Sequence, residues 1–203
     1  MTPRKRVAIL ISGRGSNMSA LIGAARAADY PAEIVGVLSN RAAAEGLRIA
    51  ESAGVPTCSL AQSRFPDRPT MDAAITAQLE AWNVEIICLA GFMRILTPAF
   101  VDRWLGRMIN IHPSLLPLFK GLDPHGQALA AGATEHGCSV HFVTHGMDEG
   151  PVILQAKVPV LEGDSPERLA ARVLIEEHRL YPQALAMVAR GEAVFPGTAH
   201  HRD

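Results

Sequence analysis

The sequence predicts an α/β fold: a mostly parallel, Rossmann-like sheet with helices on both faces and an antiparallel or mixed extension in the second half. Short, near-continuous apolar runs alternate with helical patterns through the first 112 residues, which is typical of parallel strands buried on both faces. From residue 137 onward, two segments alternate more and flank a turn-rich stretch, which indicates antiparallel strands. The chain has 203 residues and is 48% hydrophobic, enough for the core of a single domain over 1–203.

The first half is expected to contain five strands and four helices. Each strand is a short apolar run, and the runs lie at 6–12, 33–39, 55–60, 84–90 and 107–111. Helices are predicted at 17–28, 42–53, 69–82 and from 97 to about 106. Pro69 and Pro98 stand at the starts of two of these helices, where a missing N–H leaves no hydrogen bond unmade.

The second half is expected to contain a short helix at 124–131, strands at 137–144 and 151–160, and a long final helix that starts at Asp164-Ser165-Pro166. Pro182 lies inside that helix and is expected to kink or end it, because proline cannot donate the helical hydrogen bond. The tail at 191–203 is expected to be a loose arm, with the His200–His201 pair exposed to solvent.

Charge and composition exclude several classes of protein. Nineteen Lys and Arg against twenty Asp and Glu give a net charge of −1, so a nucleic-acid-binding protein is not expected. The basic start lacks the apolar region of a signal peptide, and no apolar run is long enough for a membrane helix. Cys58, Cys88 and Cys138 are scattered among apolar residues, which favours reduced thiols in a cytoplasmic protein, and no metal-ligand spacing is found.

The first candidate site is the turn LISGRGSN, at 10–17, between the first strand and the first helix. Glycines and the backbone N–H groups of a helix N-terminus favour an anion here. The turn lacks both the Walker lysine and the GxGxxG spacing, so it suits one phosphate better than a pyrophosphate. The alternative is a simple capped turn, and Arg14 would either add a cation or point to solvent.

The second candidate is the stretch MINIHPSLLP, at 108–117. Asn110 and His112 are two residues apart and therefore point to the same face of a strand. Their place at the carboxyl end of a parallel strand, where open α/β sheets bind ligands, favours a site over two ordinary hydrogen-bonded residues. An amide and an imidazole could hold a carbonyl oxygen while it becomes an oxyanion.

The third candidate is Asp148, in the glycine-rich loop THGMDEGPVI at 144–153. Alone it would be a turn-former, but beside a histidine it would favour the charged imidazolium. For the remaining histidines, ordinary hydrogen bonding is the default interpretation; they are His125, His136, His141, His145 and His178.

Six segments in this order resemble the folate-dependent phosphoribosylglycinamide formyltransferases. They are ISGRGSN, LAGFMRIL, NIHPSLLP, GCSVHFV, MDEGPVILQ and RVLIEEHRLYP, and they lie within residues 5–182. The resemblance implies formyl transfer from 10-formyltetrahydrofolate, as cosubstrate, to the amine of phosphoribosylglycinamide. It implies no metal, small-molecule partners, and a monomer or homodimer. It also implies a nucleotide-binding half at about 5–112, a folate and catalytic half at about 113–190, and the arm at 191–203.

The same resemblance implies roles for individual residues. The catalytic residues would be Asn110, His112 and Asp148, with Asn110 and protonated His112 stabilising the oxyanion. The nucleotide phosphate would be held by Gly15, Ser16 and Asn17, and the ribose by Glu177. The folate would be bound by Arg68 near its glutamyl end, by the backbone around Met93, Arg94, Ile95 and Leu96, and by Asn110 with the loop Thr144, His145, Gly146, Met147 and Asp148.

Two departures from the family pattern and three alternatives remain open at this stage. Asp123 stands where many relatives carry histidine, and Glu149 stands where glycine is frequent. A formyltetrahydrofolate hydrolase would use the same catalytic residues, but that family usually carries an additional N-terminal domain. A methionyl-tRNA formyltransferase would bring a nucleic-acid-binding domain and a basic surface. A non-catalytic nucleotide-binding module would need only the first turn.

Overall fold

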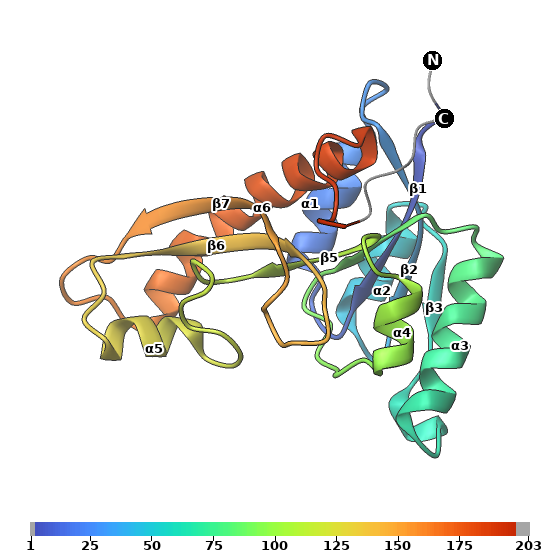
Figure 1. Cartoon of the computed structure of the whole chain (residues 1–203), viewed down its shortest axis with the longest axis horizontal. Helices are drawn as coiled ribbons and strands as arrows, with labels where there is room; N and C mark the ends of the chain where they lie inside the picture. The colour runs from blue at the N-terminus through green and yellow to red at the C-terminus, as the bar shows by residue number, and fades with distance from the viewer. Residues whose placement is uncertain (1–2, 198–203) are drawn as a thin grey trace.

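Seven strands form one mixed sheet in the order β3-β2-β1-β4-β5-β6-β7 (Figure 1). This computed structural model describes residues 3–197. The strands β1 (Lys5–Ile11), β2 (Ala32–Ser39), β3 (Thr57–Ser59), β4 (Ile86–Leu89) and β5 (Met108–His112) pair in parallel. The strands β6 (Glu135–Phe142) and β7 (Val152–Pro159) are antiparallel to their neighbours. The predicted α/β class with its antiparallel extension is therefore confirmed.

Helices cover both faces of the parallel part. One apolar layer is formed with α1 (Ser16–Ala25), α2 (Glu45–Ser52), α5 (Pro124–Ala130) and α6 (Pro166–Arg190), and the other with α3 (Arg68–Ala81) and α4 (Pro98–Arg103). In β1, Val7 and Ile9 enter the first layer while Ala8 and Leu10 enter the second, as the alternation of side chains along a strand requires. Because both faces are buried, these strands are apolar at nearly every position.

Of the two outcomes expected at Pro182, a kink or an end of the helix, the end is wrong, because α6 continues to Arg190. Its buried stripe includes Leu180, Tyr181, Ala184 and Leu185, on both sides of the proline. The burial of that stripe outweighs the one helical hydrogen bond that proline cannot make. The hydroxyl of Tyr30 also donates to the Pro182 carbonyl (2.7 Å).

Two further expectations need correction. The second helix begins at Glu45 rather than at 42, because residues 41–44 form a turn in which the Ala44 N–H donates to the Arg41 carbonyl (3.2 Å). The described part of the C-terminal arm is not loose, since the ring of Phe195 packs edge-on against Phe142 with centroids 5.7 Å apart. The rest of the arm, with His200 and His201, lies outside the described residues.

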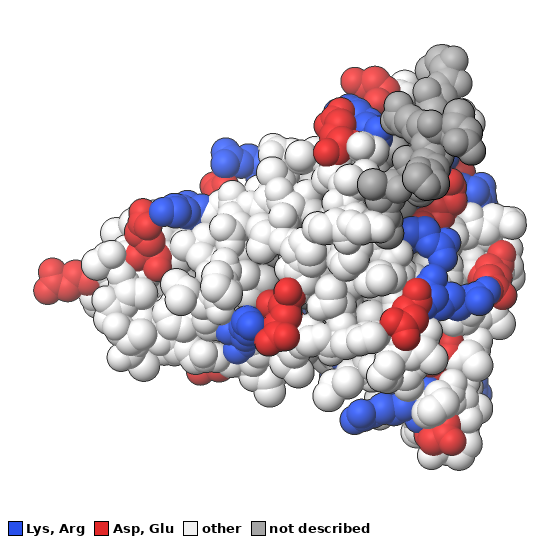
Figure 2. Space-filling view, viewed as in Figure 1, with Lys and Arg blue, Asp and Glu red and all other residues white. Residues whose placement is uncertain are grey.

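Acidic and basic side chains are interleaved on the face shown in Figure 2 and form no patch of one sign there. Cys58, Cys88 and Cys138 are free thiols, as predicted. Within residues 3–197, no helix is both long and apolar enough to cross a membrane.

Candidate active site

The loops that follow β1, β4 and β5 meet at one edge of the sheet, because these strands are parallel neighbours. Ser12 connects the first two loops: its N–H donates to the Gly91 carbonyl (3.1 Å), and its Oγ accepts from the Met93 N–H (2.8 Å). Its hydroxyl in turn donates to Asn40 Oδ1 (2.6 Å). The two turns after β1 and β4 are therefore held together by a backbone hydrogen bond and by the hydroxyl of Ser12.

Asn110 and His112 lie at the end of β5, as predicted, and β6 adds a third polar side chain. The antiparallel register places His141 directly opposite Asn110, where side chains are close neighbours. Asn110 Nδ2 is 3.2 Å from His141 Nε2, and His141 Nδ1 donates to the Phe142 carbonyl (2.9 Å).

Asp148 faces both imidazoles. Its Oδ2 is 3.4 Å from His112 Nδ1, and its Oδ1 is 3.6 Å from His141 Nε2. Its Oδ2 also accepts from the Gly121 N–H (2.9 Å). Burial raises the pKa of Asp148, but the His141 contact, the Gly121 hydrogen bond and the charge of His112 outweigh burial, so the net pKa lies below the usual value. The carboxylate is therefore ionised at neutral pH.

His112 is almost fully buried and has a hydrogen-bond acceptor on each side. Its Nε2 donates to the Phe119 carbonyl (2.9 Å), while Nδ1 faces Asp148. The imidazolium is the form with an N–H on both nitrogens. For His112 to stabilise a substrate oxyanion, the substrate oxygen has to replace one of these two acceptors. The Phe119 carbonyl, in the loop after β5, is the acceptor to be replaced, because it is uncharged whereas Asp148 carries a charge.

The turn after β1 brings together residues predicted to bind the nucleotide. Gly15 has a φ of 76°, and a Cβ there would lie 3.2 Å from the Gly46 backbone, so the turn is built for glycine. Asn17 Nδ2 donates to Glu177 Oε2 (2.7 Å), and burial raises the pKa of Glu177 although this hydrogen bond lowers it. Asn17 Oδ1 is buried and has no partner within residues 3–197, so an acceptor stands ready for a ligand hydroxyl.

The segment 93–96 after β4 exposes the side chains of Met93 and Ile95. Arg94 instead turns inward, pairs with Asp72, and donates from Nη2 to the Arg68 carbonyl (3.0 Å). Among residues 3–197, the backbone N–H groups of Ile95 and Leu96 have no hydrogen-bond partner. These two N–H groups are free to bind a ligand. The structure also places Arg68, at the start of α3, beside this segment.

The loop Thr144, His145, Gly146 and Met147 leads to Asp148 and is fastened at two points. His145 Nε2 lies 2.8 Å from Asp102 Oδ1 on α4, and Lys120 Nζ lies 3.0 Å from Glu149 Oε1. Glu149 therefore forms an ion pair between the two loops that contact His112 and Asp148. Asp123 caps α5 by accepting from the Gly126 N–H (3.1 Å).

Sequence reasoning missed His141 and Asp72. His141 was assigned ordinary hydrogen bonding, and only the β5–β6 register shows that it lies opposite Asn110. Asp72 lies within a helical pattern, and its partner Arg94 is 22 residues away. Within the described residues, no group of three or more His, Cys, Asp or Glu could hold a metal ion.

A second histidine pair, behind the cluster, predicts how stability depends on pH. His125 Nδ1 lies 3.1 Å from His136 Nε2, and His136 is fully buried. Burial and the neighbouring His125 lower the pKa of His136 from 6.5 to about 4. The unfolded chain therefore takes up this proton first as the pH falls, so the stabilisation is complete above pH 6.5 and is lost as the pH falls through about 4.

The free energy of unfolding should consequently fall by up to about 1.4 kcal/mol per pH unit within this window from His136 alone. Urea unfolding of the wild type and of His136→Gln, at several pH values, measures the difference. An equally steep pH dependence in the variant would contradict the prediction.

The fold and this cluster define an α/β enzyme in which an amide, an imidazole and a carboxylate meet at the carboxyl end of the sheet, a site suited to stabilising an oxyanion. The formyl transferase family matches residues 5–185, and the chain belongs to that family. It thus combines membership of the formyl transferase family with the mixed α/β sheet described above.

Relatives support this placement. The chain is 48% identical over 185 residues to the phosphoribosylglycinamide formyltransferase of Escherichia coli (strain K12), covering 91% of this chain and 87% of that protein. It is 50% identical over 188 residues to the trifunctional purine biosynthetic protein adenosine-3 of Homo sapiens, covering 93% of this chain but only 19% of that protein. The chain thus spans about a fifth of the human trifunctional relative.

Solved structures agree with the fold. Glycinamide ribonucleotide transformylase 1 from Symbiobacterium toebii superposes with a TM-score of 0.94 at 45% identity, over 97% of this chain and 93% of that chain. The phosphoribosylglycinamide formyltransferase from Brucella melitensis superposes with a TM-score of 0.89 at 53% identity, over 95% of this chain and 99% of that chain.

Proposed function

We propose that this protein transfers the formyl group of 10-formyltetrahydrofolate to the amine of phosphoribosylglycinamide, giving formyl-phosphoribosylglycinamide and tetrahydrofolate in purine biosynthesis. The observation that carries the proposal is the cluster of Asn110, His112 and Asp148 at the end of β5, with the phosphate-type turn after β1 at the same edge of the sheet. No metal takes part in the proposed reaction.

In the proposed reaction the substrate amine attacks the formyl carbon, and negative charge develops on the formyl oxygen. The Asn110 amide and the His112 imidazolium stabilise that oxygen, and the Asp148 carboxylate stabilises the imidazolium. Asp148 also assists the proton that leaves the amine, through water. The bond from the formyl carbon to N10 of the folate then breaks, and N10 takes up a proton.

In this proposal each ligand contacts both halves of the chain. The nucleotide phosphate binds Gly15, Ser16 and Asn17 at the start of α1, where backbone N–H groups favour an anion, and the ribose hydroxyls bind Glu177. The pterin binds the open N–H groups of Ile95 and Leu96.

The remaining folate contacts come from the exposed Met93, the loop from Thr144 to Asp148, and Arg68 near the glutamyl end. The three free thiols support a location in the reducing cytoplasm. The oligomer is proposed to be a monomer or a homodimer.

The test is an absorbance assay of 10-formyltetrahydrofolate turnover with and without phosphoribosylglycinamide. Turnover that requires the nucleotide is expected. Equal turnover without it would identify a hydrolase and refute the phosphate interpretation of the first turn. Absence of turnover in folded protein would instead support a non-catalytic nucleotide-binding role.

Replacing Glu177 by glutamine is expected to raise the KM for phosphoribosylglycinamide by about 10- to 100-fold, the effect of a hydrogen bond to a charged group. Glutamine still accepts from Asn17 through its amide oxygen, so the packing of α1 on α6 should survive. Initial rates at varied nucleotide concentration measure the effect. The matched control is Glu176→Gln, whose carboxylate instead pairs with Arg179 (2.8 Å). Equal KM values in both variants would contradict a role for Glu177.

A further inference from the structure

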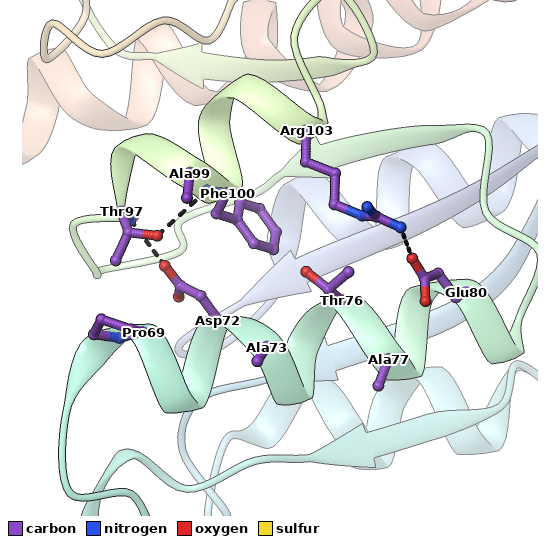
Figure 3. A pocket seen from close by; sticks show the side chains of 10 residues that line it. All are labelled: Pro69, Asp72, Ala73, Thr76, Ala77, Glu80, Thr97, Ala99, Phe100 and Arg103. Carbon is purple, nitrogen blue, oxygen red and sulfur yellow. Dashed lines mark hydrogen bonds and ion pairs between the residues drawn. The ribbon is translucent and has the colours of Figure 1, made fainter.

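A buried ion pair lies beneath the segment that is proposed to bind the pterin. The side chains of Asp72 and Arg94 are 5% and 2% exposed. Asp72 belongs to α3, and its second oxygen accepts from the Thr97 N–H (2.8 Å), where α4 begins. Figure 3 shows Asp72 pointing from α3 toward Thr97, at one end of a hollow of about 430 Å³ between α3 and α4. One carboxylate therefore holds both Arg94 and Thr97.

The segment between these contacts is held by hydrogen bonds at both ends, and, among the described residues, the N–H groups in its middle are free. The Met93 N–H is held by Ser12 Oγ and the Thr97 N–H by Asp72, while the N–H groups of Ile95 and Leu96 stay free within residues 3–197. Arg94 Nη2 also donates to the Arg68 carbonyl, so the hydrogen bonds that hold the segment extend to the start of α3. The positions of the two open amides are thus fixed by hydrogen bonds to the Ser12 hydroxyl and the buried Asp72 carboxylate.

Stability alone does not account for this pair. Burying two charges carries a desolvation penalty that well-packed apolar side chains of similar volume avoid. Arg94 Nε is, in addition, buried without a partner in the described part of the chain, which adds to the penalty. An apolar pair could not make the directional hydrogen bonds to the Thr97 N–H and to the Arg68 carbonyl.

We propose that Asp72 is a positioning residue for the folate: acting through Arg94 and Thr97, it fixes the backbone of Ile95 and Leu96 in the geometry that binds the pterin. This role rests on the proposed function. In this role, a buried residue of α3 controls the affinity for the cosubstrate without contacting either substrate.

The test is the kinetics of Asp72→Asn, which keeps the shape of the side chain and removes its charge. The KM for 10-formyltetrahydrofolate is expected to rise about tenfold or more, since the lost interactions are hydrogen bonds to a charged group. The KM for phosphoribosylglycinamide and kcat should change less than about twofold. A merely structural role would lower the melting temperature and leave both KM values unchanged, and that outcome would overturn the proposal.

The matched control is Glu80→Gln with Arg103→Gln, which removes an ion pair between the same two helices on the surface of the same hollow (Figure 3). It should leave both KM values unchanged, because exposed pairs contribute little. An equal rise in folate KM in the control would also overturn a specific role for Asp72.

If Asp72→Asn does not fold, the double variant Asp72→Leu with Arg94→Met replaces the ion pair by apolar side chains, which can be buried without hydrogen-bond partners. This double variant is expected to fold and still to bind 10-formyltetrahydrofolate weakly, and wild-type KM in it would refute the proposal. A wild-type protein that transfers no formyl group would refute the proposed function and the positioning role with it. Normal wild-type transfer with unchanged KM in the variants would refute the positioning role alone.

Discussion

Replacing His112 by alanine is expected to lower kcat by at least about 10²–10³, the typical effect of removing one donor from an oxyanion site. The physical reason is geometric: at the end of β5, His112 lies against both Asp148 and the Phe119 carbonyl, which a substrate oxygen can replace. The KM for phosphoribosylglycinamide should change little, because the proposed nucleotide contacts lie at the β1 turn. Steady-state rates with both substrates varied separate the two parameters.

The control for this variant is His178→Ala on α6. The Nε2 of His178 has no partner within residues 3–197, and His178 is not part of the proposed catalytic cluster. It should retain kcat within about twofold. The melting temperature of both variants shows whether they are folded. Near-normal turnover of folded His112→Ala would exclude His112 from catalysis.

Replacing Asp148 by asparagine should also lower kcat by at least about 10²–10³, the drop expected for His112→Ala, because it removes the charge that stabilises the imidazolium. The substitution is well matched. Asp148 has a φ of 54°, which asparagine tolerates, and an amide oxygen still accepts from the Gly121 N–H. The loss should therefore be electrostatic rather than conformational. Because the pKa of Asp148 is lowered in the folded protein, the wild-type carboxylate stays ionised across neutral and mildly acidic pH.

The neighbouring substitution Glu149→Gln serves as the control. It removes a carboxylate from the same loop, but one that is exposed and pairs with Lys120 on the surface, so its effect on kcat should correspond to about 0–1 kcal/mol. Equal losses in the two variants would attribute the effect to the loop charge in general and would contradict a specific role for Asp148.

The sequence predicted the parallel half of the sheet well because its signals are local. Each buried strand is an apolar run of four to eight residues, and each turn carries glycine or proline. The end of the last helix was less predictable, because whether Pro182 stops α6 depends on the stripe that packs against α1, β6 and β7. Tertiary burial decided that point, and burial is not visible in a local pattern.

The candidate site, too, could be predicted only in part from the sequence. Asn110 and His112 could be predicted because they are two residues apart on one strand. Their contact with Asp148, 36 residues beyond His112, came only from family resemblance, and the structure now places the two side chains 3.4 Å apart. His141 could not be recognised without the β5–β6 register, nor Asp72 without the packing of α3 against the segment after β4. Residues that act through long-range contacts leave no periodic trace in a sequence.

The order of the three central strands has a consequence for how two substrates react. Neighbouring strands lie about 4.8 Å apart, so the turns after β1, β4 and β5 are spaced across the edge of the sheet over about 10 Å. On the proposed function, the backbone itself sets the separation between the phosphate anchor, the pterin and the catalytic side chains. The alignment of amine and formyl carbon is then established during folding, and each encounter of the bound substrates starts from a fixed distance. Lengthening a turn should disturb this alignment more than replacing a side chain that lines it.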